Sequence, residues 1–117
     1  MRAAVVHEHG ALEKIVLEES SPAPEAAPGW VTLRVRAAAI NYHDLFTRRG
    51  MPGIKVPLPT IIGSDVAGEI ADLGEGVEGW EIGERVVVDP LPSLENGGKM
   101  IGEGYDGSAG RIPRARQ

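Results

Sequence analysis

The sequence lacks cysteine, has few aromatic residues and contains no long hydrophobic run. Without cysteine, disulfide bridges and thiolate-bound zinc are excluded. A membrane-spanning helix needs about 20 consecutive apolar residues, so we expect no membrane segment and a cytoplasmic location. Basic residues are also in deficit, with 12 Lys and Arg against 17 Asp and Glu. Because phosphate backbones bind basic surfaces, we expect no nucleic-acid partner.

Glycine and proline are abundant, and they divide the 117 residues into short segments. This length is typical of one domain, and folding should bury roughly two-thirds of its unfolded surface. Helical periodicity is nearly absent, whereas short β-branched runs recur between turn residues, which favours β-strands. The runs that we predict as strands are residues 1–7, 12–17, 30–40, 60–73 and 84–89. His9 and Gly10 lie between the first two and predict a hairpin turn.

Residues 30–40 show the clearest strand pattern. Apolar and polar residues alternate there, which predicts one buried face and one solvent-facing face, with Val31, Leu33 and Val35 on the first and Thr32, Arg34 and Arg36 on the second. Residues 60–73 are predicted as one strand broken by Gly63 and Gly68. Glycines inside a strand mark a bulge or a close approach of another backbone or a ligand.

One short helix is predicted over residues 41–49. Asn41 suits the N-cap, Asp44 is an acid in the first turn, and Gly50 is placed to end the helix. Several short strands, glycine-rich turns and one helix near residues 42–49 together predict a mainly β fold, a partly open β-barrel.

Glycine-containing motifs then follow in a fixed order along the chain. Residues 63–70 read GSDVAGEI, Gly74 and Gly76 follow, and residues 83–86 read GERV. With the opening MRAAVV and the AINYHD of residues 39–44, this order resembles the N-terminal, GroES-like catalytic domain of the medium-chain dehydrogenase/reductase family. The family includes alcohol dehydrogenases and quinone reductases. The resemblance covers residues 1–107.

The resemblance has implications for zinc. Zinc-dependent members have Cys at the position of Asn41, and His-Glu at the positions of Ser64 and Asp65. Oxygen donors at these positions suit zinc poorly, because zinc prefers nitrogen and sulfur ligands. The loop of residues 90–104 also lacks the cysteines of the family's structural zinc site. The resemblance therefore points to the zinc-independent, quinone reductase-like branch and to no metal.

Within that branch, the implied activity is hydride transfer from NADP or NAD in its reduced form to a quinone or an α,β-unsaturated carbonyl. The residues implied as catalytic are Asn41, Tyr42 and His43, and those implied to line the site are Asp44, Ser64 and Asp65. Asn41 and Tyr42 would orient the substrate or nicotinamide, and His43 would donate a proton. Each also has a structural interpretation. Asn41 would be a helix cap, Tyr42 a packing residue on the same helix face as Phe46, and His43 a solvent-facing side chain. Asp44 would be a buried hydrogen-bond partner, and Ser64 and Asp65 would be residues of a bulged strand.

The family binds its cofactor on a Rossmann domain that follows the catalytic domain. Residues 102–107 match G-x-G-x-x-G, but Gly110 and Pro113 prevent the helix that this motif requires. We therefore expect no Rossmann domain here, a truncated product with an irregular basic tail at 108–117, and no activity of the isolated chain. Substrate and cofactor would bind only after completion by a Rossmann domain. Unpaired strand edges predict a homodimer. A free-standing GroES-like interaction module without catalysis remains the alternative.

Overall fold

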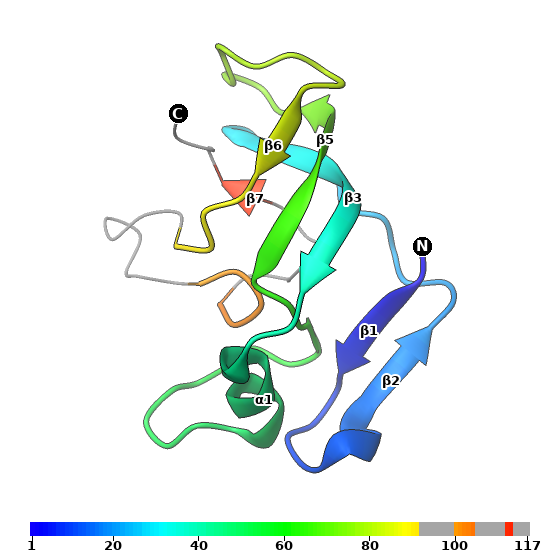
Figure 1. Ribbon diagram of the computed structural model, residues 1–117, viewed down its shortest axis with the longest axis vertical. Helices are drawn as coiled ribbons and strands as arrows, with labels where there is room; N and C mark the ends of the chain where they lie inside the picture. The colour runs from blue at the N-terminus through cyan, green and yellow to red at the C-terminus, as the bar shows by residue number, and fades with distance from the viewer. Residues whose placement is uncertain (92–99, 105–111, 114–117) are drawn as a thin grey trace.

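The structure, a computed structural model, describes residues 1–91, 100–104 and 112–113 (Figure 1). The helices and strands are β1 (Ala3–Val6), the 3-10 helix η1 (Leu12–Lys14), β2 (Ile15–Glu18), β3 (Trp30–Ala39), α1 (Tyr42–Arg49), β4 (Thr60–Ile61), β5 (Asp65–Leu73), β6 (Arg85–Val87) and β7 (Ile112–Pro113). The predicted mainly β fold with one short helix near residues 42–49 is confirmed. In the described ranges, no helix is long and apolar enough to cross a membrane.

The strands form two antiparallel sheets. One has the order β2-β1-β4 and the other the order β6-β5-β3-β7. Figure 1 shows α1 at one end of the second sheet, where β3 finishes and β5 begins. The short strand β7 pairs with the start of β3, although residues 108–117 were predicted to be irregular; the rest of that segment lies outside the described residues. Pairing of sheet edges between copies stays a prediction.

The prediction of a single strand over residues 60–73 is wrong. β4 pairs with β1 in the first sheet, whereas β5 pairs with β3 in the second. The chain changes sheet at Gly63, whose φ of 112° is rarely adopted by residues with a side chain. Gly68 does not break β5. A Cβ atom there would lie 2.5 Å from the carbonyl oxygen of Arg34, so the close backbone approach predicted for this glycine is one between β3 and β5.

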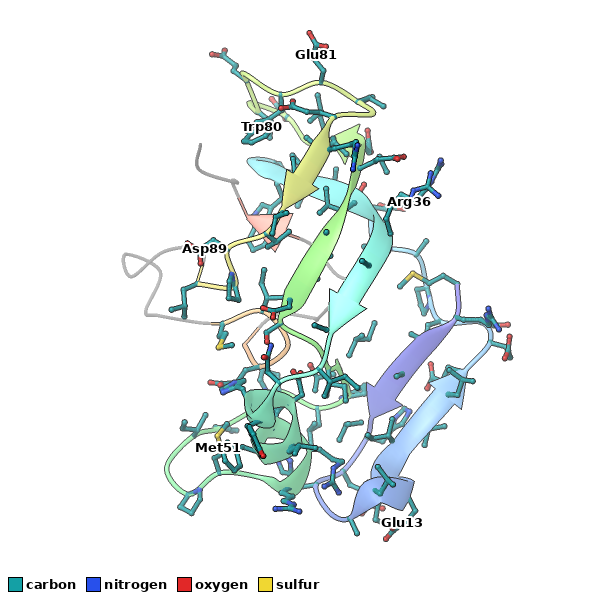
Figure 2. The ribbon with its side chains drawn as sticks, viewed as in Figure 1. Glu13, Arg36, Met51, Trp80, Glu81 and Asp89 are labelled. Carbon is teal, nitrogen blue, oxygen red and sulfur yellow. The ribbon has the colours of Figure 1, made fainter. Side chains whose placement is uncertain are left out.

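The regular alternation predicted for β3 is also wrong. Thr32 is buried and Val35 is 37% exposed, the reverse of the expected pattern. The pairing of β3 with β5 shifts register between Thr32 and Leu33 and again between Val35 and Ala37. Each irregularity changes which face the following side chain occupies. Arg36 remains on the outside, where Figure 2 shows it projecting away from the sheet, and it donates to Glu69 at 3.0 Å.

The β1–β2 hairpin is attached to α1 through its connecting segment. The two strands pair as predicted, but the connection is longer than a tight His9–Gly10 turn and includes η1. The buried Arg48 donates through Nη1 to the carbonyl oxygen of Gly10 at 2.7 Å, and the Gly10 N–H donates back to the Arg48 carbonyl at 3.0 Å. His9 Nδ1 lies 3.0 Å from the Thr47 carbonyl oxygen. These bonds hold the first sheet against the helix.

A small apolar core lies beside the second sheet. Val66, Val88 and the fully buried Ile101 form a cluster, against which Leu33 packs. The Val88 N–H donates to the Val66 carbonyl at 2.9 Å, and the Ile101 N–H donates to the Pro90 carbonyl at 3.0 Å. Burying an isoleucine side chain contributes up to about 3 kcal/mol, so Ile101 fixes the segment that follows it.

The close approach at Gly68 predicts a large cost of adding one methyl group. Gly68→Ala should lower the free energy of unfolding by about 3 kcal/mol, because the backbones of β3 and β5 must separate. Gly79→Ala is the control: its φ is 78° but nothing lies within 4 Å of the added Cβ, so only about 1 kcal/mol is expected. Urea unfolding followed by circular dichroism measures both. Equal losses in the two variants would contradict the packing argument.

Candidate functional site

The carboxylate of Asp44 joins the start of α1 to the segment after β4. Asp44 is only 2% exposed. Its Oδ2 accepts the backbone N–H of Asn41 at 2.7 Å, and its Oδ1 accepts the backbone N–H of Gly63 at 3.1 Å. An acid in the first turn of a helix is also favoured by the helix dipole. Both carboxylate oxygens are therefore engaged in holding the backbone.

Asn41 and Ser64 meet directly above this junction. The Asn41 Nδ2 group donates to Ser64 Oγ at 3.2 Å. Ser64 is 1% exposed, whereas Asn41 is half-buried. Asn41 is the N-cap residue of α1, as predicted, and its side chain also reaches across to Ser64. A cap position and a place in the candidate site are thus compatible.

His43 faces an acidic residue that the sequence prediction missed. Its Nε2 atom lies 2.7 Å from Glu103 Oε2, and the two side chains are 26% and 18% exposed. The two atoms lie within ion-pair distance, but the His43 ring is not aligned for a hydrogen bond from Nε2 to Glu103. The signal in the sequence is the pair of glycines around Glu103, which belongs to the G-x-G-x-x-G match at residues 102–107. We call Asn41, His43, Asp44, Ser64 and Glu103 the α1 cluster.

Two of the predicted site residues lie outside the α1 cluster. Tyr42 is 79% exposed and projects from the first turn of α1 into solvent. Asp65 is exposed at the start of β5, where it pairs with Ala39 through the backbone ladder. Of the six residues proposed from sequence, Asn41, His43, Asp44 and Ser64 come together, and Tyr42 and Asp65 do not join them.

The donor atoms of this region do not fit a zinc ion. Asn41 and Ser64 offer neutral oxygen atoms and already bond to each other, and Asp65 faces away in solvent. Zinc in proteins is held by cysteine, histidine and carboxylate ligands in a tetrahedral set. Over residues 1–91 and 100–104, no three His, Cys, Asp or Glu side chains are grouped so that they could hold a metal ion.

A separate cavity of about 400 Å³ opens between β1, β4 and β3. Aliphatic side chains such as Leu33, Val35 and Ile62 line it, together with Arg2 and Arg34. None of the residues of the α1 cluster contributes to its wall. The cavity is therefore not the place where the predicted chemistry would occur.

Comparison with known proteins identifies the family. Residues 27–111 match the alcohol dehydrogenase GroES-like domain. The chain belongs to that family. The medium-chain dehydrogenase/reductase family to which this domain belongs, and the GroES-like fold, are thus as predicted from the sequence.

Three relatives illustrate the family. The synaptic vesicle membrane protein VAT-1 homolog of Rattus norvegicus is 39% identical over 89 residues, which are 75% of this chain and 22% of that protein. Acryloyl-coenzyme A reductase of Metallosphaera sedula is 43% identical over 65 residues, 55% of this chain and 19% of the reductase. The crystal structure of an NAD-dependent alcohol dehydrogenase superposes with a TM-score of 0.82 at 31% identity, over 97% of this chain and 38% of that enzyme.

The chain thus spans about a fifth of the curated relatives that it matches. Its relatives include nicotinamide-dependent oxidoreductases, and in such proteins the GroES-like domain forms one part of a larger molecule. Within the described structure, the α1 cluster contains four of the six residues that the resemblance to the family predicts for the site.

The two bonds of Asp44 predict a clear stability loss for Asp44→Asn. The amide keeps one acceptor oxygen and turns an NH₂ group toward a backbone N–H, so one buried donor loses its partner. We expect the free energy of unfolding to fall by about 2 kcal/mol. The control is Asp65→Asn on the exposed β5 end, which should change stability by less than about 0.5 kcal/mol. If chemical denaturation finds the two variants equally stable, Asp44 does not hold this junction.

Proposed function

We propose that this domain forms the substrate side of a zinc-independent oxidoreductase site in a longer protein. The reaction would be hydride transfer from NADH or NADPH to a quinone or an α,β-unsaturated carbonyl. The observation that carries the proposal is the Asn41–Ser64 hydrogen bond beside His43, at positions where zinc-dependent members of the family have metal ligands. The reductase of Metallosphaera sedula, named for an unsaturated acyl substrate, supports the same substrate class.

The proposed substrate class follows from the neutral oxygen donors. Removal of hydride from an alcohol requires an alkoxide, which zinc stabilises in metal-dependent enzymes. Asn41 and Ser64 offer no comparable positive charge. A conjugated carbonyl or a quinone is already polarised toward accepting hydride, so hydrogen-bond donors suffice to stabilise the negative charge that develops on its oxygen.

Reduction of an enone illustrates the proposed roles. The β-carbon of the enone would accept the hydride that a reduced nicotinamide, bound by another domain, supplies. The electron pair of the carbon–carbon double bond moves toward the carbonyl, whose oxygen becomes negatively charged. The Asn41 amide would donate a hydrogen bond to that oxygen, and His43 would deliver the proton that completes the saturated product. Asp44 and Ser64 would keep Asn41 in place, and Tyr42 would contact the substrate or nicotinamide only in the assembled protein.

Substitution of Asn41 tests this proposal in a longer protein that carries the domain together with its cofactor-binding domain. Oxidation of NADH or NADPH is followed with a benzoquinone and with an enone as the hydride acceptor. The reverse reaction, in which ethanol reduces the oxidised cofactor, is followed with added zinc. Asn41→Ala should lower kcat for the enone by about 100-fold, the typical effect of losing one oxyanion donor. Arg49→Gln, at the exposed end of α1, is the matched control and should retain full activity.

Three results would contradict the proposal. Unchanged turnover in a folded Asn41→Ala variant would remove Asn41 from the mechanism. Zinc-stimulated ethanol oxidation would show that the site uses a metal. Absence of turnover with every acceptor, in a protein that binds nicotinamide, would favour the alternative of an interaction module without catalysis.

A further inference from the structure

We infer that Glu103 is a positioning residue that holds the imidazole ring of His43 and determines which of its nitrogens exchanges a proton with the substrate. The inference rests on the proposed role of His43 as proton donor. The contact of Glu103 with His43 joins the turn of residues 100–104 to the first turn of α1, and Figure 1 shows these two segments close together.

The geometry of the pair differs from that of an ordinary surface contact. His43 Nε2 is buried, and the two side chains are 26% and 18% exposed at a separation of 2.7 Å. His7 and Glu18 form a pair at the same distance, but their side chains are 51% and 31% exposed. Water screens the electrostatic attraction within a partly buried pair less than that within an exposed pair. Side chains that are already partly buried also lose less conformational entropy when the pair forms. Among the described residues, His43 Nε2 has no aligned hydrogen-bond partner, and catalytic hydrogen bonds are often poorly aligned until substrate binds.

The backbone around Glu103 is held firmly. Ile101 is fully buried in the core, and the N–H groups of Glu103 and Gly104 both donate to the Met100 carbonyl, at 3.2 and 2.8 Å. Gly102, with a φ of 79°, packs so closely that a Cβ atom there would lie 2.8 Å from the Gly63 carbonyl oxygen. The turn of residues 100–104 therefore holds the Glu103 carboxylate beside His43.

A carboxylate beside Nε2 restricts the protonation of the ring. An ionised carboxylate can only accept hydrogen bonds, so Nε2 must carry its proton toward Glu103. Nδ1 is then the nitrogen that gains or gives up a proton during the reaction. Asp44 uses its two oxygens to accept backbone N–H groups, and the carboxylate oxygen that lies beside His43 Nε2 is that of Glu103. Glu103 is the carboxylate of the α1 cluster that is left to orient His43.

The first test uses the 117-residue chain and requires no activity. Long-range ¹H–¹⁵N spectra report which ring nitrogen of each histidine carries a proton, and a His43→Asn variant assigns the His43 signals. We expect His43 to be protonated on Nε2, and His9 on Nδ1, because His9 Nδ1 faces a carbonyl oxygen that can only accept. The exposed His7 gives the reference for rapid exchange of a ring N–H with water.

Substitution of Glu103 is then compared with a matched control. In Glu103→Ala, exchange of the His43 Nε2 proton with water should become at least tenfold faster. Glu103→Gln should largely restore slow exchange, because its amide oxygen still accepts. Glu78→Ala, on an exposed turn, should leave the signal unchanged. An Nδ1-protonated His43, or equal exchange rates in the wild type and Glu103→Ala, would overturn the inference.

Kinetics of the longer protein separate this inference from the proposed function. With an enone substrate, Glu103→Ala should lower kcat by about tenfold with little change in KM, less than the ~10²-fold or greater loss expected when acid–base catalysis is removed. Glu103→Gln should recover part of kcat. If the spectra show the expected proton position but no variant affects turnover, Glu103 still orients His43 and the proposed proton-donor role is wrong. If the spectra show no proton on His43 Nε2, or no dependence of its exchange on Glu103, the inference is wrong whether or not the enzyme is active.

Discussion

The rest of the site depends on the buried carboxylate of Asp44. It accepts one backbone N–H from Asn41, the N-cap residue of α1, and one from Gly63, which lies 19 residues after Asp44 in the chain. Gly63 is also where the chain passes from the first sheet to the second. This side chain therefore ties the start of the helix to the point where the chain changes sheet. Asn41 and Ser64, which flank the two bonded groups, are brought within hydrogen-bond distance as a result.

Gly63 is held from two directions. Asp44 accepts its N–H, while the backbone at Gly102 lies against its carbonyl oxygen with no room for a side chain. The second contact is maintained by Ile101, which is buried with Val66 and Val88. Burial of Ile101 in the apolar core thus keeps Gly102 against Gly63, and so helps to hold the α1 cluster in place. Three segments distant in sequence contribute one side chain or more each to the α1 cluster, and none of them could form it alone.

Local patterns in the sequence predicted the local features of the structure. The capping residue Asn41, the first-turn acid Asp44 and the terminating Gly50 identified α1, because these positions act within one helical turn. The motif around Gly63 and Ser64 indicated the family. The resemblance to that family placed in one site four residues that lie close together in the structure: Asn41, His43, Asp44 and Ser64. The prediction went wrong where distant pairing decides the outcome. Register shifts reversed the burial of Thr32 and Val35, and no periodicity could reveal them.

The same distinction explains why Glu103 was missed: its role depends on a contact between His43 and Glu103, which lie 60 positions apart in the sequence. The order in which these contacts become available during synthesis is correspondingly fixed. Both partners of the Asp44–Gly63 bond are present once residue 63 has been synthesised. His43 meets Glu103 only after residue 103 has emerged and Ile101 has entered the core. Of the contacts within the α1 cluster, the histidine–glutamate pair is thus the last for which both partners are present in a growing chain.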